Sequence, residues 1–585
     1  MDKKKSSWTD IRETAERGDA EAQFNLGLMY RSGEGVEQDE NKAMNWLLKS
    51  ADQDFGAAQF YLGVMYHNGD GVTQDYVEAV KWYRKAAEQG HAVAQNTLGW
   101  MYENGKGVPQ SNVEAVKWYS NEAEQGDACS QYTLGLRYRT GEGIERNDVE
   151  AAKWLGKAAG QGLAEAQFSL GMMFYSGEGV HQDYAEAMSW FRKAAGQENA
   201  EAQFHLGLMY DEGKGVPRDN AEAVKWYRKA AERGNAGAQS NLAVKYENGE
   251  GVPQDYAEAV KLYRKAAQQG DAEAQCHMGV MYHNGNGVPQ NYVEAVKWYR
   301  KAAKQGSAKA QCHLGVMYHK GNGVKEDIAE ASKWYREAAQ QGNAEALNNL
   351  KTMCSKGVPA AQLNMGLMYE EGKGVPRDYA EAVKWYSRAA GQEFAQAQLN
   401  LGLMYIKGDG FPVDDAEAVK WFRKAAVQGF AEAQLHLGLM YRFGEGVSPD
   451  DAEAARWFLK AAEKDNADAQ FNLGMMCILG EGLPQNAVEA ARWFDKAARQ
   501  GECDAQFNLG LLYRSGQGVP ADDAKAAEWF LKAAEQGHVR AQINLAWMYQ
   551  KGEGVPHDAN ESLKWYREAA QQGNAYAQCC LGLMY

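Results

Sequence analysis

The fold is decided by the stretch Ala200-Glu-Ala-Gln-Phe-His-Leu-Gly-Leu-Met-Tyr210. Its pattern, Ala-x-Ala-Gln-x-x-Leu-Gly-x-Met-Tyr, returns every 36 residues. The alanine before the glutamine stands at Ala22, Ala58, Ala94 and each 36th residue up to Ala346, with Ser130 in the fourth copy. A fixed period of this length predicts a stack of similar supersecondary units.

One unit, from Gly234 to Gly270, predicts two helices. The first, helix A, covers 236–246 and is apolar on almost every face, so we expect it to be buried between neighbours. Gly249 suits the left-handed residue that ends a helix, and Pro253 prevents continuation. The second, helix B, then runs to about residue 268, with one apolar and one charged face.

Helix B opens on a capping box, Asp255 followed by Glu258. In such a box the first side chain caps the first turn and the glutamate reaches back to the backbone N–H of the cap residue. The box recurs in 13 of the 15 complete units, the exceptions being Asp39/Lys42 and Asp522/Lys525. Tryptophan recurs in helix B, with Leu262 in one unit, and its regularity favours core packing over sugar stacking.

These residues resemble the Sel-1-like repeat family, a branch of the tetratricopeptide-like helical superfamily. The matching motifs are Ala-x-Ala-Gln-x-x-Leu-Gly-x-Met-Tyr, Gly-x-Gly-Val-Pro and Glu-Ala-Val-Lys-Trp-Tyr-Arg-Lys-Ala-Ala-Glu-Gln-Gly, and they cover nearly the whole chain. The resemblance implies an all-α, right-handed α/α superhelix (solenoid) of 36-residue helix-turn-helix repeats. It also implies adaptor work, in which the protein holds other proteins together, as in bacterial contact with host cells.

Composition narrows the class of protein. The formal net charge is −15 and no basic stripe is present, so nucleic acid is an unexpected partner. No run of apolar residues is long enough for membrane insertion. The eight cysteines do not pair within units, and residues 1–10 lack the apolar stretch of a signal peptide. We therefore expect a cytoplasmic protein, or one exported without an N-terminal signal peptide.

The period breaks once, between Ala346 and Ala361, where the step is 15 residues and a loop and helix B are missing. One interpretation is a deletion absorbed by local adjustment. We favour another, in which 344–356 caps a first array and a second array follows, because terminal repeats need a polar outer face. The predicted domains are 1–356, with a half-unit cap, nine units and a terminal half-unit, and 357–585, with six units and an incomplete last one. A kink or loss of continuity is expected near Gly357.

Signs of catalysis are weak. The Gly-x-Gly pairs lack the residues of a nucleotide loop. Some secreted relatives have reported penicillin-binding or β-lactamase activity, but this chain has no Ser-x-x-Lys tetrapeptide. The set Cys276, His277 and His283 recurs in the next unit, yet its members are too far apart along a helix to converge on a metal. We expect no catalytic site, cofactor or metal, and keep a cell-wall or β-lactam hydrolase as the alternative.

Binding candidates lie on helix A. The residue two after the recurrent glutamine is usually polar, and a ladder of such side chains would clamp the backbone of an extended peptide; the competing interpretation is that each bonds a neighbouring helix. Trp100 and Trp547 replace an aliphatic residue and are either exposed anchors or core substitutions. We predict a non-catalytic scaffold for a protein or peptide along a concave groove. The candidate residues are Asn364, Asn400, His436, Asn472, Asn508, Asn544, His277, His313, Trp100 and Trp547.

Overall fold

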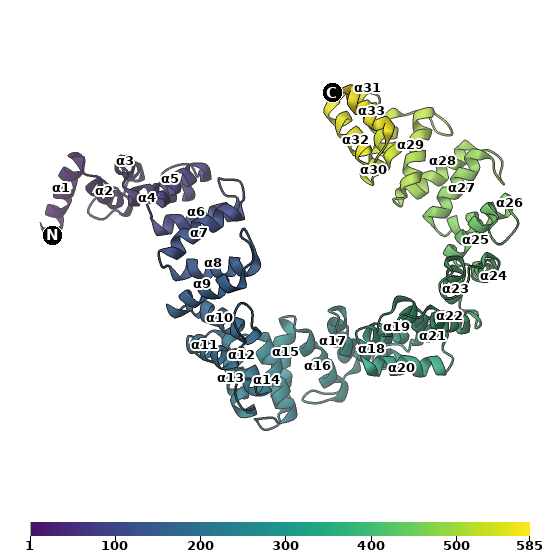
Figure 1. Cartoon of the computed structure of the whole chain (residues 1–585), viewed down its shortest axis with the longest axis horizontal. Helices are drawn as coiled ribbons and strands as arrows, with labels where there is room; N and C mark the ends of the chain where they lie inside the picture. The colour runs from purple at the N-terminus through teal and green to yellow at the C-terminus, as the bar shows by residue number, and fades with distance from the viewer. Residues whose placement is uncertain (1, 585) are drawn as a thin grey trace. The chain divides into compact units, whose positions relative to one another are not determined.

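The structure, a computed structural model, describes residues 2–584, in which it has 33 α-helices and no strand. The chain comprises two compact units, residues 1–290 and 291–585. Within each unit, every helix packs on the helices before and after it in the chain (Figure 1). The prediction of an all-α solenoid of 36-residue helix pairs is confirmed.

In the described part of the first unit, residues 2–290, there are sixteen helices. They are α1 (Asp2–Glu16), α2 (Ala20–Ser32), α3 (Glu40–Ala51), α4 (Gly56–Asn68), α5 (Tyr76–Glu88), α6 (Ala92–Asn104), α7 (Asn112–Glu124), α8 (Ala128–Thr140), α9 (Asp148–Gly160), α10 (Ala164–Ser176), α11 (Tyr184–Gly196), α12 (Ala200–Glu212), α13 (Asn220–Glu232), α14 (Ala236–Asn248), α15 (Tyr256–Gln268) and α16 (Ala272–Asn284).

The described part of the second unit contains the other seventeen. They are α17 (Tyr292–Lys304), α18 (Ala308–Lys320), α19 (Ile328–Gln340), α20 (Ala344–Ser355), α21 (Pro359–Glu371), α22 (Tyr379–Ala390), α23 (Ala395–Lys407), α24 (Asp415–Val427), α25 (Ala431–Phe443), α26 (Asp451–Ala462), α27 (Ala467–Leu479), α28 (Ala487–Arg499), α29 (Cys503–Ser515), α30 (Asp523–Glu535), α31 (Val539–Lys551), α32 (Ala559–Gln571) and α33 (Ala575–Met584). None of the helices in residues 2–584 has the length and apolar character needed to cross a membrane.

Each hydrophobic core joins helix B of one repeat to helix A of the next. Around α11 and α12, Phe191 and Met209 are fully buried, and Trp226 from the following helix B packs against them. Most helix B tryptophans are half-buried in this way, and a lysine often covers the outer face of the ring, as Lys229 covers Trp226 at 4.2 Å. The half-buried rings support core packing, rather than sugar stacking, as the role of these tryptophans.

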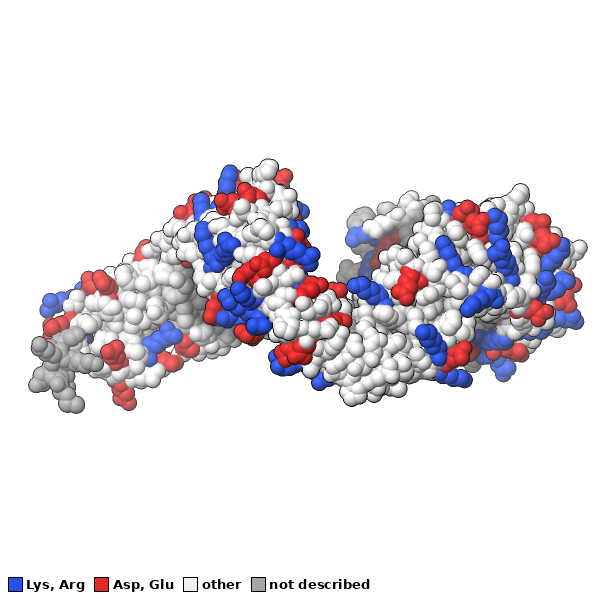
Figure 2. All heavy atoms as spheres, turned by 90° about the horizontal axis from the view of Figure 1, so that it is seen from below, with Lys and Arg blue, Asp and Glu red and all other residues white. Residues whose placement is uncertain are grey.

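The predicted capping box is half right. The cap residue accepts from the backbone as expected, since Asp255 Oδ1 receives the N–H groups of Ala257 and Glu258 at 2.9 and 3.0 Å. Glu258 does not reach back to the N–H of the cap residue, because that N–H already donates to the carbonyl of Tyr246 in helix A at 2.9 Å. The glutamate instead pairs with Lys261 on the exposed face of helix B. Such pairs recur, and acidic and basic side chains are correspondingly mixed over the surface in Figure 2.

The recurrent glutamine of helix A joins successive repeats through two hydrogen bonds, which we call the glutamine latch. Gln398, which is 1% exposed, donates from Nε2 to the carbonyl of Ala390 in the preceding helix B at 3.1 Å. Its Oε1 accepts from Gln428, at the end of its own helix B, at 2.8 Å. Because a buried amide left without partners would cost about 1–3 kcal/mol, this pair of bonds explains why the glutamine recurs.

Gln434 provides a test of the latch, because Lys464 stands where the second glutamine is expected. The buried Oε1 of Gln434 has no partner. At the equivalent site, Gln161 bonds both Gln131 Oε1 and the Gly126 carbonyl at 2.8 Å. We therefore expect Lys464→Gln to raise the free energy of unfolding by about 1 kcal/mol. Urea unfolding measures this change.

The control for Lys464→Gln is Lys407→Gln, which makes the same charge change at an exposed position of α23. It should leave the unfolding midpoint unchanged. Equal stabilisation by both variants would assign the gain to charge and contradict the latch.

The break in the period is bridged by one helix that acts as both A and B. The N-terminus of α20 is capped by Asn343, as in a helix A, whereas its C-terminus gives the Cys354 carbonyl to Gln362, as in a helix B. Next, α21 packs on both α19 and α20, and one hydrophobic cluster runs from Tyr335 through Leu350 to Met368. The core is therefore continuous past Gly357, although the stacking there is irregular. The domain boundary at 356/357 stays a prediction.

Candidate protein-binding groove

One face of helix A remains outside the core in each repeat. In α25 the residues one before, three after and six after Gln434 are Ala433, Leu437 and Met440, and all are buried. The residues two and five after it, His436 and Leu439, lie on the other side of the helix and are partly exposed. This face of helix A is accessible to a partner. The predicted row of polar residues lies on it.

In the second unit this face is hollowed into two adjoining cavities of about 550 and 450 Å³. They share Phe471 and Asp504, so we treat them as one feature, the α25–α31 groove. Cavities of this size suit a ligand or a peptide side chain. The groove is lined by Glu432, Leu435, His436, Leu439, Asn466, Asp468, Phe471, Asn472, Met475, Glu502, Asp504, Phe507, Asn508, His538, Val539 and Arg540.

Three predicted residues line this groove: His436, Asn472 and Asn508. The imidazole of His436 stacks on Phe422 with ring centroids 5.1 Å apart. Burial lowers the pKa of His436, so its ring is neutral near pH 7. The amides of Asn472 and Asn508 donate to carbonyls one turn earlier, at 2.9 and 2.7 Å. All three side chains stay partly exposed. Each therefore remains accessible to a ligand in spite of its intramolecular contact.

Asn364 is the exception in the predicted row. It is 4% exposed, donates to Ser332 Oγ at 2.8 Å and accepts from Arg336 at 3.0 Å. The missing helix B lets α21 reach α19, and this contact closes over the amide. Asn364 is therefore an internal packing residue, and the expectation that it meets a partner is wrong.

Asn400 and Asn544 are half-exposed. Asn400 accepts from Gln396 at 3.1 Å. Asn544 accepts from Arg514 of the preceding repeat at 2.8 Å. Arg442 bonds Asn472 in the same way at 3.1 Å. Arg442 and Arg514 each lie in the last turn of their helix A and thus meet the polar row of the next repeat, so the two repeat positions form one surface.

His277 and His313 pack on tyrosines of helix B in the same way as His436 packs on Phe422. The ring centroids of His277 and Tyr263 lie 4.8 Å apart, and those of His313 and Tyr299 lie 4.9 Å apart. His277 Nδ1 also lies 3.3 Å from Glu247 Oε2. Within the described residues, no group of three or more His, Cys, Asp or Glu side chains could hold a metal ion.

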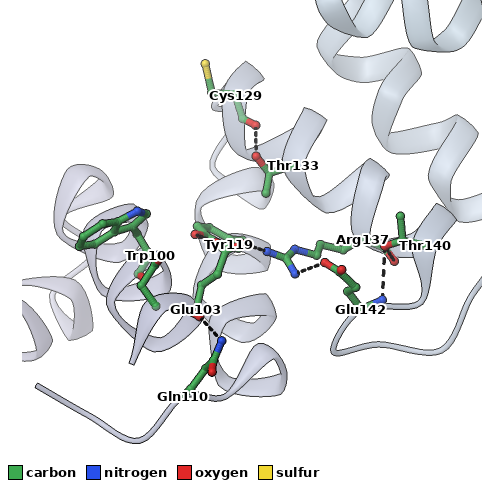
Figure 3. Close-up of polar contacts among 10 residues, drawn as sticks. Trp100, Glu103, Gln110, Tyr119, Cys129, Thr133, Arg137, Thr140 and Glu142 are labelled. Atoms are coloured by element: carbon green, nitrogen blue, oxygen red, sulfur yellow. Dashed lines mark hydrogen bonds and ion pairs between the residues drawn. The ribbon is translucent and has the colours of Figure 1, made fainter. Parts of the chain in front are cut away.

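Trp100 is 42% exposed, which makes it a surface residue rather than a core substitution. Its ring stacks on His67 of the preceding repeat with centroids 6.0 Å apart. Figure 3 shows its indole pointing away from a polar cluster on the other side of α6. There Arg137 bonds Glu103 of the preceding repeat and Glu142 of its own loop, and its side chain is 8% exposed.

Trp547 is half-buried and packs against the core of the last repeats. The guanidinium of Arg514 lies 4.3 Å from the centre of its ring. Trp100 and Trp547 therefore make the same kind of contact: each indole covers a residue in the last turn of helix A of the preceding repeat. Only Trp100 leaves a large apolar area uncovered.

Sequence reasoning missed the acidic edge of the groove. Glu432, Asp468 and Asp504 occupy the same place in three successive A helices, two residues before the recurrent glutamine, and all are exposed. The apolar floor of the groove was not predicted either. Leu435 and Phe507 form part of this floor, and each is 7% exposed. The signal was available as a run of like charge at one repeat position, although first-turn acids are ordinary in helices.

The groove has little that suggests catalysis. Cys503 lies between the lining residues Glu502 and Asp504, but burial raises the pKa of its thiol, and its Sγ contacts the Ala533 carbonyl at 3.7 Å. His538 lies 3.1 Å from Asp504 and stacks on Phe507. A reactive cysteine needs a lowered pKa, so this arrangement does not activate the thiol.

Stacked helix pairs with an exposed face on helix A define the chain as an α-solenoid repeat protein. The Sel1 repeat model matches fifteen segments: residues 20–55, 56–91, 92–127, 130–163, 164–199, 200–235, 236–271, 272–307, 308–343, 359–393, 395–430, 431–466, 467–502, 503–538 and 539–574. The chain belongs to the Sel1 repeat family. Proteins of this family generally mediate protein–protein interactions and are generally non-catalytic.

Two solved bacterial structures are similar to the chain. A protective antigen of uropathogenic Escherichia coli with an SLR fold is 32% identical over 85% of this chain and 97% of its own, with a TM-score of 0.45. A Sel1 repeat protein from Oxalobacter formigenes is 36% identical over 56% of this chain and 90% of its own, with a TM-score of 0.38. No curated protein matches. The family assignment therefore rests on the repeats themselves.

Proposed function

We propose that this protein is a non-catalytic scaffold that binds a protein through an extended segment laid in the α25–α31 groove. The observation that carries the proposal is the continuity of the groove across four A helices, with an apolar floor and polar side chains at each repeat. Binding surfaces commonly combine apolar anchors with hydrogen-bonding groups, and both are present.

The spacing of the repeats suits an extended chain. Packed helices lie about 8–10 Å apart, and an extended peptide advances about 3.3 Å per residue. Every third residue of such a peptide would therefore meet an equivalent position of the next A helix. His436, Asn472 and Asn508 would bond its backbone, while Phe471 and Phe507 would contact its apolar side chains.

The test is peptide display against the full-length protein. Random peptides of about 12 residues are long enough to cross four helices about 10 Å apart. We expect peptides that bind the protein and lose binding to the triple variant His436→Ala/Asn472→Ala/Asn508→Ala. The control is Lys420→Ala/Arg456→Ala/Arg492→Ala, on the exposed face of helix B in α24, α26 and α28.

The control triple should bind every selected peptide as the parent protein does. Circular dichroism establishes that both variants keep their helices. Selection that yields no peptide sensitive to the groove triple would refute the proposed function.

A further inference from the structure

We propose that the segment bound in the α25–α31 groove is basic, with lysine or arginine at about every third residue and apolar residues between. This inference rests on the proposed function and adds the chemistry of the partner. It comes from the coincidence of three features at the same repeats: the apolar floor, the exposed amide row and an acidic edge.

The acidic edge consists of Glu432, Asp468 and Asp504. Each is the second residue of its helix, in α25, α27 and α29, and each is exposed along the groove. The carboxylate of Asp504 lies 3.1 Å from His538 Nε2, and 59% of the side chain stays exposed. Three carboxylates at one repeat position form a line that follows the groove rather than an isolated cluster.

The other charged groups of the groove do not cancel this line. Glu502 caps α29 by accepting from the N–H of Ala505, so its carboxylate is already engaged and we do not count it with the edge. His436 is neutral near pH 7 because burial lowers its pKa. Arg540 holds the same repeat position in α31 and ends the acidic run. Arg442 is engaged by Asn472 and Glu481 on the opposite edge.

Helix stability alone does not account for the three acids. Carboxylates in a first turn do favour a helix. Acids recur at this position, as in Glu165 and Glu201, but it is Val93, Cys129, Gly237, Lys309 or Arg540 in other repeats, and all of these helices form. The fold therefore leaves this position free, and three consecutive acids there are available for electrostatic recognition.

The floor between the acids selects the rest of the segment. Leu439, Phe471, Met475 and Phe507 lie beside the acidic edge in the two cavities. Since successive A helices lie about 10 Å apart, three residues of extended chain separate one carboxylate from the next. A basic side chain at every third position would meet the acids, and apolar side chains would contact the floor.

The probe is a labelled synthetic peptide in which Lys-Leu-Thr is repeated four times. Fluorescence anisotropy with the full-length protein should show binding that weakens as salt is added. Glu432→Gln/Asp468→Asn/Asp504→Asn should weaken it by about tenfold or more. A peptide with glutamate in place of lysine should not bind.

Two controls separate the groove from general charge attraction. Glu417→Gln/Glu453→Gln/Glu489→Gln makes the same charge change on the exposed face of helix B and should leave affinity unchanged. A peptide of the same composition with its lysines gathered at one end should bind more weakly than the spaced peptide. Equal loss in both triple variants, or equal binding of both peptides, would overturn the inference.

Peptide display separates this inference from the proposed function. Groove-dependent peptides that lack regularly spaced basic residues would leave the scaffold function standing and refute the basic partner. An absence of groove-dependent peptides would refute both.

Discussion

Gly179→Ala should reduce the free energy of unfolding by about 4 kcal/mol, the largest effect we expect of any single methyl group in this protein. Gly179 lies in the loop between α10 and α11 with φ +70°, a conformation that side chains rarely adopt. A Cβ built there would lie 2.0 Å from the carbonyl oxygen of Asp148 in the preceding repeat. The obstacle is backbone, so no side chain can turn aside to make room.

Gly162→Ala is the matched control for this change. Gly162 also has a positive φ, +96°, but a Cβ there would have no atom within 4 Å. Because this variant introduces only backbone strain, its free energy of unfolding should fall by about 1 kcal/mol. Urea unfolding followed by circular dichroism gives both values. Similar losses in the two variants would mean that the loop yields, and would contradict the close approach of the repeats at Gly179.

Lys245→Ala should reduce the free energy of unfolding by about 3 kcal/mol, because it removes a buried cation from between two acids. Lys245 stands where most repeats have methionine, and its side chain is 5% exposed. Its Nζ lies 2.6 Å from Asp211 of the preceding repeat and 2.7 Å from Glu250 of its own loop. Alanine would leave both a cavity and two carboxylates without their partner.

Lys245→Met distinguishes the cavity from the charge. Methionine fills the space, as Met281 does in the next repeat, where the preceding acid is Glu247. We therefore expect this variant to be about 2 kcal/mol more stable than Lys245→Ala, because both substitutions leave the two carboxylates without the cation but only alanine leaves a cavity as well. The same unfolding measurement applies. Equal destabilisation by both substitutions would show that the ion pairs, and not the packing, hold the two repeats together here.

Ser130 illustrates how a departure from the repeat is understood only in three dimensions. It replaces the motif alanine, and eight residues earlier Glu122 replaces the first alanine of the pair near the end of helix B. Ser130 Oγ donates to Glu122 Oε2, and both side chains are buried. The two changes compensate each other, and burial raises the pKa of Glu122.

The sequence predicted some of the side chains that line the groove, and their contact with a partner stays a prediction. His436, Asn472 and Asn508 were predicted from one polar repeat position and line the groove. Asn364 fits the same pattern but is buried, because the short step before it brings α21 against α19. A repeat position predicts a face of a helix, whereas exposure depends on which helices pack against that face.

The period alone determined the helix pairs, their glycine-ended first helices and their capped second helices, because these depend on residues a few positions apart. Only the tertiary structure decided which face of helix A stays open, since that helix is apolar on almost every side. It also decided that Glu432, Asp468 and Asp504, each 36 residues from the next, form one edge. Stacking brings together side chains that lie far apart along the chain, and the charge, depth and reach of the groove follow from that stacking.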